Sequence, residues 1–327
     1  MPHTSYHSDD IHIIYAGGTF GSHGSPLSPL PADVFLPTLV QLLNTRLKDK
    51  PVVLQNTCIK DSSSLNPSDF VHFFSLISTA HQQGARRFIL ITGTDTLSFL
   101  ASFLSCAFAN DELSLVITGS MTPLLVSDNP IHQINDDSDA WHNLSEAIDV
   151  CKNRQGVFVQ FFHQTFWADN TQKIDSQNPN AFFGTSIHSP KPILPTINKK
   201  PISFLKSQAT KAHIHSVFVL PNHADNLASQ LANISHDTTK AIILIAFGAG
   251  NLPKTQRIID ELERLHTNHI PIVCTTMCAF HGVSDTYEAG AWQYKHHVWS
   301  GGQLSIPAIY GRLLWLYAND ALHAEFW

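Results

Sequence analysis

Short, uninterrupted apolar runs alternate with stretches of helical periodicity along the whole chain, and this alternation constrains the fold more than any other feature. Four apolar runs in the first half predict strands buried on both faces, at residues 11–16, 51–59, 87–92 and 114–118. Helical spacing follows each of them, at residues 33–48, 68–83, 97–109 and 139–152. Because crossovers between parallel strands are right-handed, this βαβ series predicts a parallel sheet with helices on both faces.

The second half of the chain repeats the alternation after a change of composition. Residues 193–212 are rich in Pro, Lys, Ser and Thr without a clear period, which is typical of a linker. Beyond it we predict strands at residues 216–220, 241–247 and 270–275 and helices at 224–233, 253–266 and 307–318. The expected protein is of the α/β class, with an N-terminal parallel-sheet, three-layer domain over residues 1–192 and a smaller C-terminal α/β domain over residues 213–327.

The overall charge and hydropathy argue against two classes of partner. With 43% apolar residues, 14% charged residues and a net charge of -6, the chain has no long-range attraction for nucleic acid or anionic membranes. No apolar run reaches the roughly 18 residues that a membrane span needs. The polar N-terminus, with Asp9 and Asp10, lacks the basic start and apolar run of a secretory signal. We therefore expect a cytoplasmic protein that binds neither nucleic acid nor membrane.

Cysteines and histidines do not form a recognisable metal motif. The five cysteines are an odd number in mostly apolar surroundings, which indicates reduced core thiols. The chain has 20 histidines but no His-Glu-x-x-His spacing, and the best pairs are His213/His215 and His296/His297. A solvated surface position is favoured over ligation for most of the others. No metal site is predicted.

Small polar residues follow the predicted strands at the points where the strands end. The segments there are Ala16-Gly17-Gly18-Thr19-Phe20-Gly21, Lys60-Asp61-Ser62-Ser63-Ser64, Thr92-Gly93-Thr94-Asp95-Thr96 and Thr118-Gly119-Ser120. Each segment alone is explained as a turn with a residue that caps the next helix. Because ligands of parallel sheets collect beyond the carboxyl ends of the strands, four such ends together predict a polar crevice. A threonine nucleophile in it would need a nearby proton acceptor and donors for the developing oxyanion.

These segments together resemble the bacterial L-asparaginase/glutaminase family, and the short form of the chain is similar to its cytoplasmic, type I-like branch. Gly17-Gly18-Thr19 looks like the first threonine signature of the family and Gly93-Thr94-Asp95-Thr96 like the second. Supporting segments are Asp61-Ser62-Ser63, Ile117-Thr118-Gly119-Ser120, Gly248-Ala249-Gly250-Asn251 and the helix at 307–318. The resemblance implies a two-domain α/β fold, no cofactor, a small amino-acid amide as substrate, and a homodimer or homotetramer with sites completed at a subunit interface.

The resemblance also implies a role for individual residues. It makes Thr19 the nucleophile that is acylated, with Thr94, Asp95 and Lys173 as the supporting catalytic group. Lys173 is expected in the loop after a strand at 156–162, where without the family it would be read as an exposed lysine. Ser62, with Ser63 beside it, and Thr94 and Asp95 are expected to bind the substrate, Ser62 its α-carboxylate and Asp95 its α-amino group. The implied reaction converts L-asparagine to L-aspartate and ammonia through a threonine acyl-enzyme.

The chain also departs from the family pattern, as a divergent member would. The family usually places a tyrosine on a mobile loop after the first threonine, but the segment 21–31 contains none. Tyr287, in the segment 283–290, is a hypothetical substitute supplied across a subunit interface. Milder departures are Ala16 in place of a hydroxyl residue, Ser64 in place of an aspartate and Thr92 in place of a histidine.

Two other classes of function compete with the hydrolase. Gly248-Ala249-Gly250 follows a predicted strand but lacks the third glycine of a dinucleotide fingerprint, since Pro253 stands there. The more serious alternative is a non-catalytic sensor of asparagine or aspartate, or an amidotransferase subunit of the same fold. The two threonines, the aspartate and the lysine favour the enzyme, because binding alone does not need this combination of groups.

Overall fold

The computed structural model describes residues 6–48, 51–126 and 133–327, and the chain divides into two compact units, Met1–Leu194 and Pro195–Trp327. The first unit is built on a seven-stranded sheet with the order β4-β1-β5-β6-β7-β8-β9. Its strands are β1 Ile11–Tyr15, β4 Val52–Val53, β5 Arg87–Ile91, β6 Ser114–Thr118, β7 Gly156–Phe161, β8 Gln164–Lys173 and β9 Phe182–Ser186. The strands up to β7 are parallel, and β8 and β9 are antiparallel to their neighbours. The sheet is therefore mostly parallel, as predicted.

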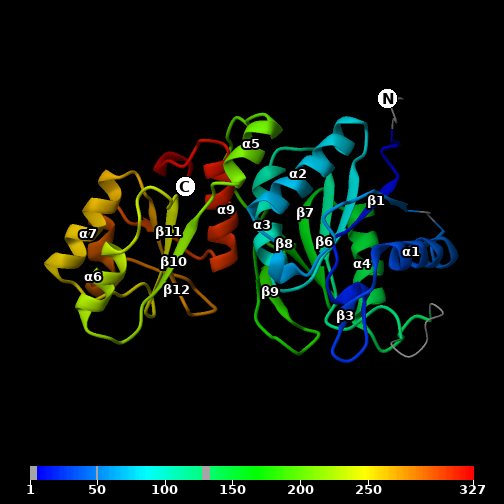
Figure 1. Ribbon diagram of the computed structural model, residues 1–327, viewed down its shortest axis with the longest axis horizontal. Helices are drawn as coiled ribbons and strands as arrows, with labels where there is room; N and C mark the ends of the chain where they lie inside the picture. Colours follow the sequence, from blue (N-terminus) through cyan, green and yellow to red (C-terminus); the bar gives the residue numbers. More distant parts are fainter. Residues whose placement is uncertain (1–5, 49–50, 127–132) are drawn as a thin grey trace. The chain divides into compact units, whose positions relative to one another are not determined.

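Helices cover both faces of this sheet, which explains why its central strands are apolar throughout. The helices are α1 Ala32–Arg46, α2 Pro67–Gln82, α3 Leu97–Ala107 and α4 Asp139–Asn153. Helices α1 and α4 lie on one side and α2 and α3 on the other (Figure 1). In β1, Ile11, Ile13 and Tyr15 pack with α1 and α4, and the residues between them are buried on the opposite face. The predicted three-layer arrangement is confirmed.

The second unit has a smaller parallel sheet with the order β10-β11-β12-β13. Its elements are α5 Ile202–Ala209, β10 Ile214–Phe218, α6 Ala224–Ala232, β11 Ala241–Ala246, α7 Gln256–Thr267, β12 Ile272–Thr276, α8 Glu288–Ala291, β13 Trp299–Ser300 and α9 Ile306–Ala318. Alternate residues of β11 pack in two clusters: Ile242 and Leu244 with α6 and α7, and Ile243 and Ile245 with α9. This unit is also α/β, as predicted.

The predicted strand at 51–59 was wrong in its extent, since only Val52–Val53 is a strand. Leu54 still donates its backbone N–H to Ile13 O, at 2.9 Å. The side-chain amide of Asn56 then donates to the carbonyls of Tyr15 and Cys58, both at 2.9 Å. A side chain thus takes over the hydrogen bonds that would have extended the strand pairing.

Two further expectations need correction. The segment 193–212, predicted as a linker, contains helix α5, which begins after Pro201 and buries Leu205 and Ala209. Apolar residues on one side of two turns of helix give too weak a period to be recognised in the sequence. Cys278 is exposed rather than a core thiol, whereas Cys106, Cys151 and Cys274 are buried.

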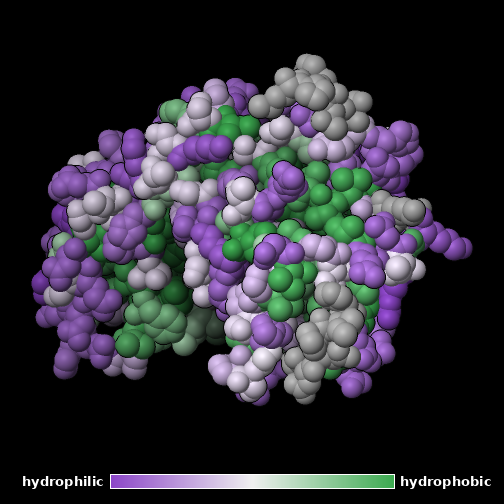
Figure 2. Space-filling model, turned by 45° about the vertical axis from the view of Figure 1, so that its right-hand side comes forward, coloured by the Kyte–Doolittle hydropathy of each residue, from purple (hydrophilic) through white to green (hydrophobic). Residues whose placement is uncertain are grey.

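None of the helices in the described part of the chain combines the length and the apolarity that crossing a membrane requires. On the face seen in Figure 2, hydrophilic residues surround separate hydrophobic patches. Apolar atoms make up more than half of the accessible surface of folded proteins, so apolar patches are expected on such a face.

Candidate active site

A cavity of about 210 Å³ in the first unit brings together most of the predicted site residues. It lies where strands β1, β5 and β6 end, at the edge of the sheet that the sequence predicted. The predicted residues that line it are Thr19, Ser62, Thr94, Asp95 and Lys173. Ser63 is outside the set of described lining residues, because its hydroxyl turns back and donates to Asp61 Oδ1 at 2.6 Å.

Two glycines allow the two threonine segments to approach each other. β1 and β5 are neighbours, with Tyr15 opposite Ile91, so the segments that follow them start side by side. Gly18 has φ 87° and ψ -173°, a conformation open almost only to glycine. A Cβ atom at Gly18 would overlap the backbone of Gly93. The close backbone contact therefore brings Thr19 and Thr94 to the same cavity.

Replacing Gly18 by alanine is expected to lower the free energy of unfolding by about 2–4 kcal/mol, because backbone strain and steric overlap add. Urea unfolding of the purified variant measures it. Gly24→Ala is the matched control: Gly24 also has a positive φ, of 83°, but the nearest atom to its added Cβ is Pro26 O at 3.5 Å. An equal loss of stability in both variants would contradict the role given to the contact with Gly93.

Lys173 connects the second threonine segment to a charge. Its Nζ donates to Thr94 Oγ1 at 2.8 Å and to Asp95 Oδ1 at 2.9 Å. Thr94 is only 7% exposed, whereas the side chain of Asp95 is 61% exposed and that of Lys173 is 21% exposed. A hydroxyl in contact with an amine can pass on a proton, and the accessible carboxylate is free on its outer side to bind a ligand cation.

Lys173 was expected in a loop, but it is the last residue of strand β8. The hairpin between β7 and β8 turns at Phe162 and His163, both of which have positive φ. Only the first part of β8 pairs with β7, and its pairing with β9 is irregular between Phe166 and Thr171. Strand β8 packs along α3, and its last residue reaches Thr94, two residues before the N-cap of that helix.

The segment after β4 supplies the third side of the cavity. Asp61 caps the short 3-10 helix Ser62–Ser64 by accepting from the backbone N–H of Ser63 at 2.8 Å. The buried hydroxyl of Ser62 accepts from the backbone N–H of Asp95 at 3.3 Å. The hydroxyl of Thr96 donates to Ser62 O at 2.7 Å. These hydrogen bonds fix Ser62 against the second threonine segment.

Three lining side chains were not among the predicted site residues: Asp61, Met121 and Ser176. Met121 directly follows the polar segment at the end of β6, so its position in the sequence could have indicated that it lines the cavity. Ser176 lies in the turn closed by Asp175, whose carboxylate accepts from the N–H groups of Gln177 and Asn178. These two hydrogen bonds lower the pKa of Asp175. No motif in the sequence marked this turn.

The backbone around Met121 is held by one buried carboxylate. Asp139, at the start of α4, accepts from the N–H groups of Met121 at 2.9 Å and Thr122 at 3.0 Å. It also accepts from the side-chain amide of Asn143 at 3.0 Å. The helix N-terminus favours this negative charge. Asp139 therefore positions a wall of the cavity without lining it.

Asp139→Ala is expected to destabilise the protein by about 3 kcal/mol, because buried amide donors lose their acceptor. It should also raise the KM for substrate, since Met121 is no longer fixed. Thermal unfolding and steady-state kinetics measure the two effects, with the exposed Asp137→Ala as control. Unchanged stability and KM in Asp139→Ala would contradict this role.

No cysteine is among the described residues that line this cavity, and the buried thiols elsewhere in the chain are not reactive. Burial and a hydrogen bond to Asp69 raise the pKa of the Cys58 thiol to about 12. Burial raises the pKa of Cys274 to about 12 and that of Cys151 to about 11. These groups are protonated at neutral pH and therefore weak nucleophiles.

The predicted histidine pairs are used in other ways. The rings of His213 and His215 lie 4.2 Å apart, and His296 contacts Glu263 Oε1 at 2.8 Å through Nδ1. Among the residues that the structure describes, no three His, Cys, Asp or Glu side chains are grouped so as to hold a metal ion.

Comparison with known proteins matches both units. Residues 10–210 match the asparaginase N-terminal domain, and residues 216–326 match the glutaminase/asparaginase C-terminal domain. L-asparaginase 1 of Escherichia coli strain K12 is 25% identical over 95% of this chain and 92% of its own. The structure of the thermostable L-asparaginase from Thermococcus kodakarensis aligns with a TM-score of 0.71 at 23% identity, covering 95% of this chain and 94% of that one. L-asparaginase I from Vibrio cholerae gives a TM-score of 0.74 at 21% identity, with 95% and 93% covered. The chain belongs to the asparaginase family and is a hydrolase that acts on amides.

Proposed function

We propose that the protein hydrolyses L-asparagine to L-aspartate and ammonia through an acyl-enzyme on Thr19. The observation that carries the proposal is the position of Lys173 Nζ, which contacts both Thr94 Oγ1 and Asp95 Oδ1 in the cavity that Thr19 also lines. The Thr94 hydroxyl, the Lys173 amine and the Asp95 carboxylate are in contact and form a path for protons. The Thr19 hydroxyl lines the same cavity. Such a group is what a threonine nucleophile requires.

The proposed reaction has two steps. In the first, Thr19 Oγ1 attacks the side-chain amide carbon, its proton passes to the leaving nitrogen, and ammonia departs from a threonine ester. In the second, water attacks the ester, and its proton returns to Thr19 Oγ1 as aspartate forms. Thr94 and Lys173 carry the proton in both steps, and Asp95 holds the ammonium form of Lys173.

Substrate binding uses the polar groups at the strand ends. We assign the α-carboxylate to Ser62 and the backbone beside it, and the α-amino group to the exposed outer side of Asp95. A volume of about 210 Å³ suits a small amino acid rather than a peptide. The proposed substrate is therefore a free amino-acid amide.

Ammonia release from the purified protein tests the proposal, with L-asparagine, L-glutamine and their D-isomers as substrates. We expect release from L-asparagine with saturation kinetics. Calorimetric binding of asparagine or aspartate without release, at high protein concentration, would replace the enzyme by a sensor. Release that appears only in a complex with a second protein would indicate an amidotransferase subunit.

Several features implied by the resemblance stay predictions. These are a cytoplasmic location, a homodimer or homotetramer with shared sites, and a contribution of Tyr287 to acylation. Tyr287 lies in the second unit, at the start of α8, and its side chain is largely exposed. An exposed phenol is suited to complete a site after assembly, and a Tyr287→Phe variant with unchanged turnover would remove it from the mechanism.

A further inference from the structure

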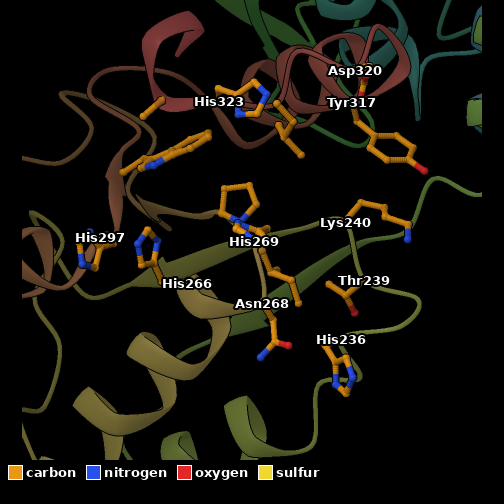
Figure 3. Close-up of a pocket in the computed structure, with 15 residues that line it drawn as sticks. His236, Thr239, Lys240, His266, Asn268, His269, His297, Tyr317, Asp320 and His323 are labelled. Carbon is orange, nitrogen blue, oxygen red and sulfur yellow. The ribbon is translucent and has the colours of Figure 1, made fainter.

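The second unit contains a cavity of about 450 Å³, more than twice the volume of the candidate active site (Figure 3). It lies at the amino ends of β11 and β12, next to the carboxyl ends of α7 and α9. All of its lining residues belong to the second unit, so it shares none with the site built around Thr19. Volumes of 300–1,000 Å³ are typical of sites for small organic ligands.

The cavity is lined by an unusual set of nitrogen groups. Five imidazoles and one amine surround it, from His236, Lys240, His266, His269, His297 and His323. Among the described lining residues, Asp320 alone is acidic. Figure 3 shows Tyr317 and His323 on one side, and Lys240, His266 and His269 on the other. Lysine and protonated histidine are donors without acceptors, so this lining favours an anion.

Most of the hydrogen-bonding capacity of Lys240 is available to such an anion. Its Nζ donates to Asp237 O at 3.3 Å, a long hydrogen bond that uses one of three donors. His266 and His297 stack at 3.7 Å with an interplanar angle of 7°, an arrangement that two cations would oppose unless an anion lay nearby. Glu263 is one such anion, with its Oε2 3.7 Å from His297 Nε2, and an anion in the cavity would be a second.

A buried hydroxyl at the cavity gives an independent indication of a ligand. Thr239 lines the cavity, is only 2% exposed, and its Oγ1 has no hydrogen-bond partner among the described residues. A buried hydroxyl without a partner costs stability, and protein interiors usually avoid it. A bound molecule with a hydroxyl or phosphate oxygen would supply the missing partner.

The rest of the lining is apolar and aromatic. Ile270, Pro271 and Leu322 form apolar surface, and Trp299 and Tyr317 contribute rings. Flat aromatic groups bind well against such surfaces, because the rings gain both burial and stacking. An inorganic anion would leave this part of the cavity unused.

We propose that this cavity binds a small anion that carries an aromatic ring, of the chemical class of a nucleoside monophosphate. The phosphate lies against Lys240 and the imidazoles, the base lies against Trp299 and Tyr317, and a hydroxyl or phosphate oxygen bonds Thr239 Oγ1. This site is separate from amide hydrolysis and does not depend on its mechanism.

Isothermal titration calorimetry tests the proposal with adenosine 5′-monophosphate, adenosine and inorganic phosphate as probes. We expect the monophosphate to bind at least about tenfold more tightly than either part, since both walls contribute. Lys240→Met should weaken its binding by about tenfold, as loss of a charge-assisted hydrogen bond implies. Lys206→Met, at an exposed position of α5, is the control and should bind as the wild type does.

Thr239→Val separates a ligand role from a purely structural one. Because valine has nearly the same shape but no hydroxyl, the unliganded variant should melt at the same or a higher temperature. Its stabilisation by the monophosphate should nevertheless be smaller than that of the wild type. Equal stabilisation of both proteins, equal binding of phosphate and monophosphate, or no binding at millimolar probe would each overturn the proposal.

Discussion

Replacing Lys173 by methionine is expected to lower kcat for amide hydrolysis by about 10³-fold, within the range for loss of a general acid–base group. Methionine keeps much of the apolar stem but removes the nitrogen that contacts Thr94 Oγ1 and Asp95 Oδ1. Thr94 then has no amine with which to exchange a proton. Steady-state ammonia release measures the effect.

The stability of Lys173→Met should change little, which separates catalysis from folding. Asp95 is 61% exposed in this ion pair, and pairs with a solvent-exposed partner contribute about 0–1 kcal/mol. Thermal unfolding of the variant should therefore resemble that of the wild type. A large loss of stability would show that Lys173 acts mainly by holding β8 in place.

Lys173→Arg is the informative companion variant. Arginine keeps the positive charge and can pair with Asp95, but it does not lose its proton in proteins. If Lys173 accepts a proton, the arginine variant should be almost as inactive as the methionine variant. Near-wild-type activity of Lys173→Arg would contradict proton transfer and leave only an electrostatic role.

The residues at the ends of parallel strands could be predicted because their position follows from a simple rule. Strands β1 and β5 are continuous apolar runs, and the glycines after them mark the turns. Once the strands are known to be parallel, Thr19 and Thr94 must lie at the same edge of the sheet. In the structure both threonines line the same cavity. Local sequence signals were therefore sufficient to predict this part of the site.

Lys173 could be named from the family resemblance, but its structural setting could not be predicted. The hairpin that precedes it turns at Phe162 and His163, both of which have positive φ. Turns of this kind usually contain glycine or asparagine, and this one contains neither, so the sequence gives no turn signal there. The irregular pairing of β8 then depends on tertiary contacts with α3. A position set by long-range packing leaves little trace in the local sequence.

The same reasoning explains the other differences from expectation. Strand β4 ends early because the side chain of Asn56 bonds to Tyr15 O, a contact between residues 41 positions apart. Met121 lines the cavity because Asp139 holds its backbone from the start of another helix. Each of these features is decided by one long-range hydrogen bond, which periodicity does not record.

Thr19→Ala is expected to lower kcat by about 10⁴-fold or more, the size of effect seen when a nucleophile is removed from an enzyme that forms a covalent intermediate. Binding of asparagine should remain, because Ser62 and Asp95 are unchanged. Calorimetry with the variant measures binding, and ammonia release measures turnover. Retained binding with lost turnover would assign Thr19 to the chemistry rather than to recognition.

The acylated residue can be identified directly, which distinguishes Thr19 from Thr94. Rapid acid quenching of the wild type with substrate, followed by peptide mass spectrometry, should find the acyl group on Thr19. Thr19→Ser keeps a hydroxyl and should retain part of the activity, whereas Thr94→Val should slow formation of the ester without moving it. An ester found on Thr94 would exchange the roles of the two threonines, because Thr94 Oγ1 is the hydroxyl in contact with Lys173. Full activity in Thr19→Ala would exclude the acyl-enzyme on Thr19 and leave an ester on Thr94 or direct attack by water on the amide.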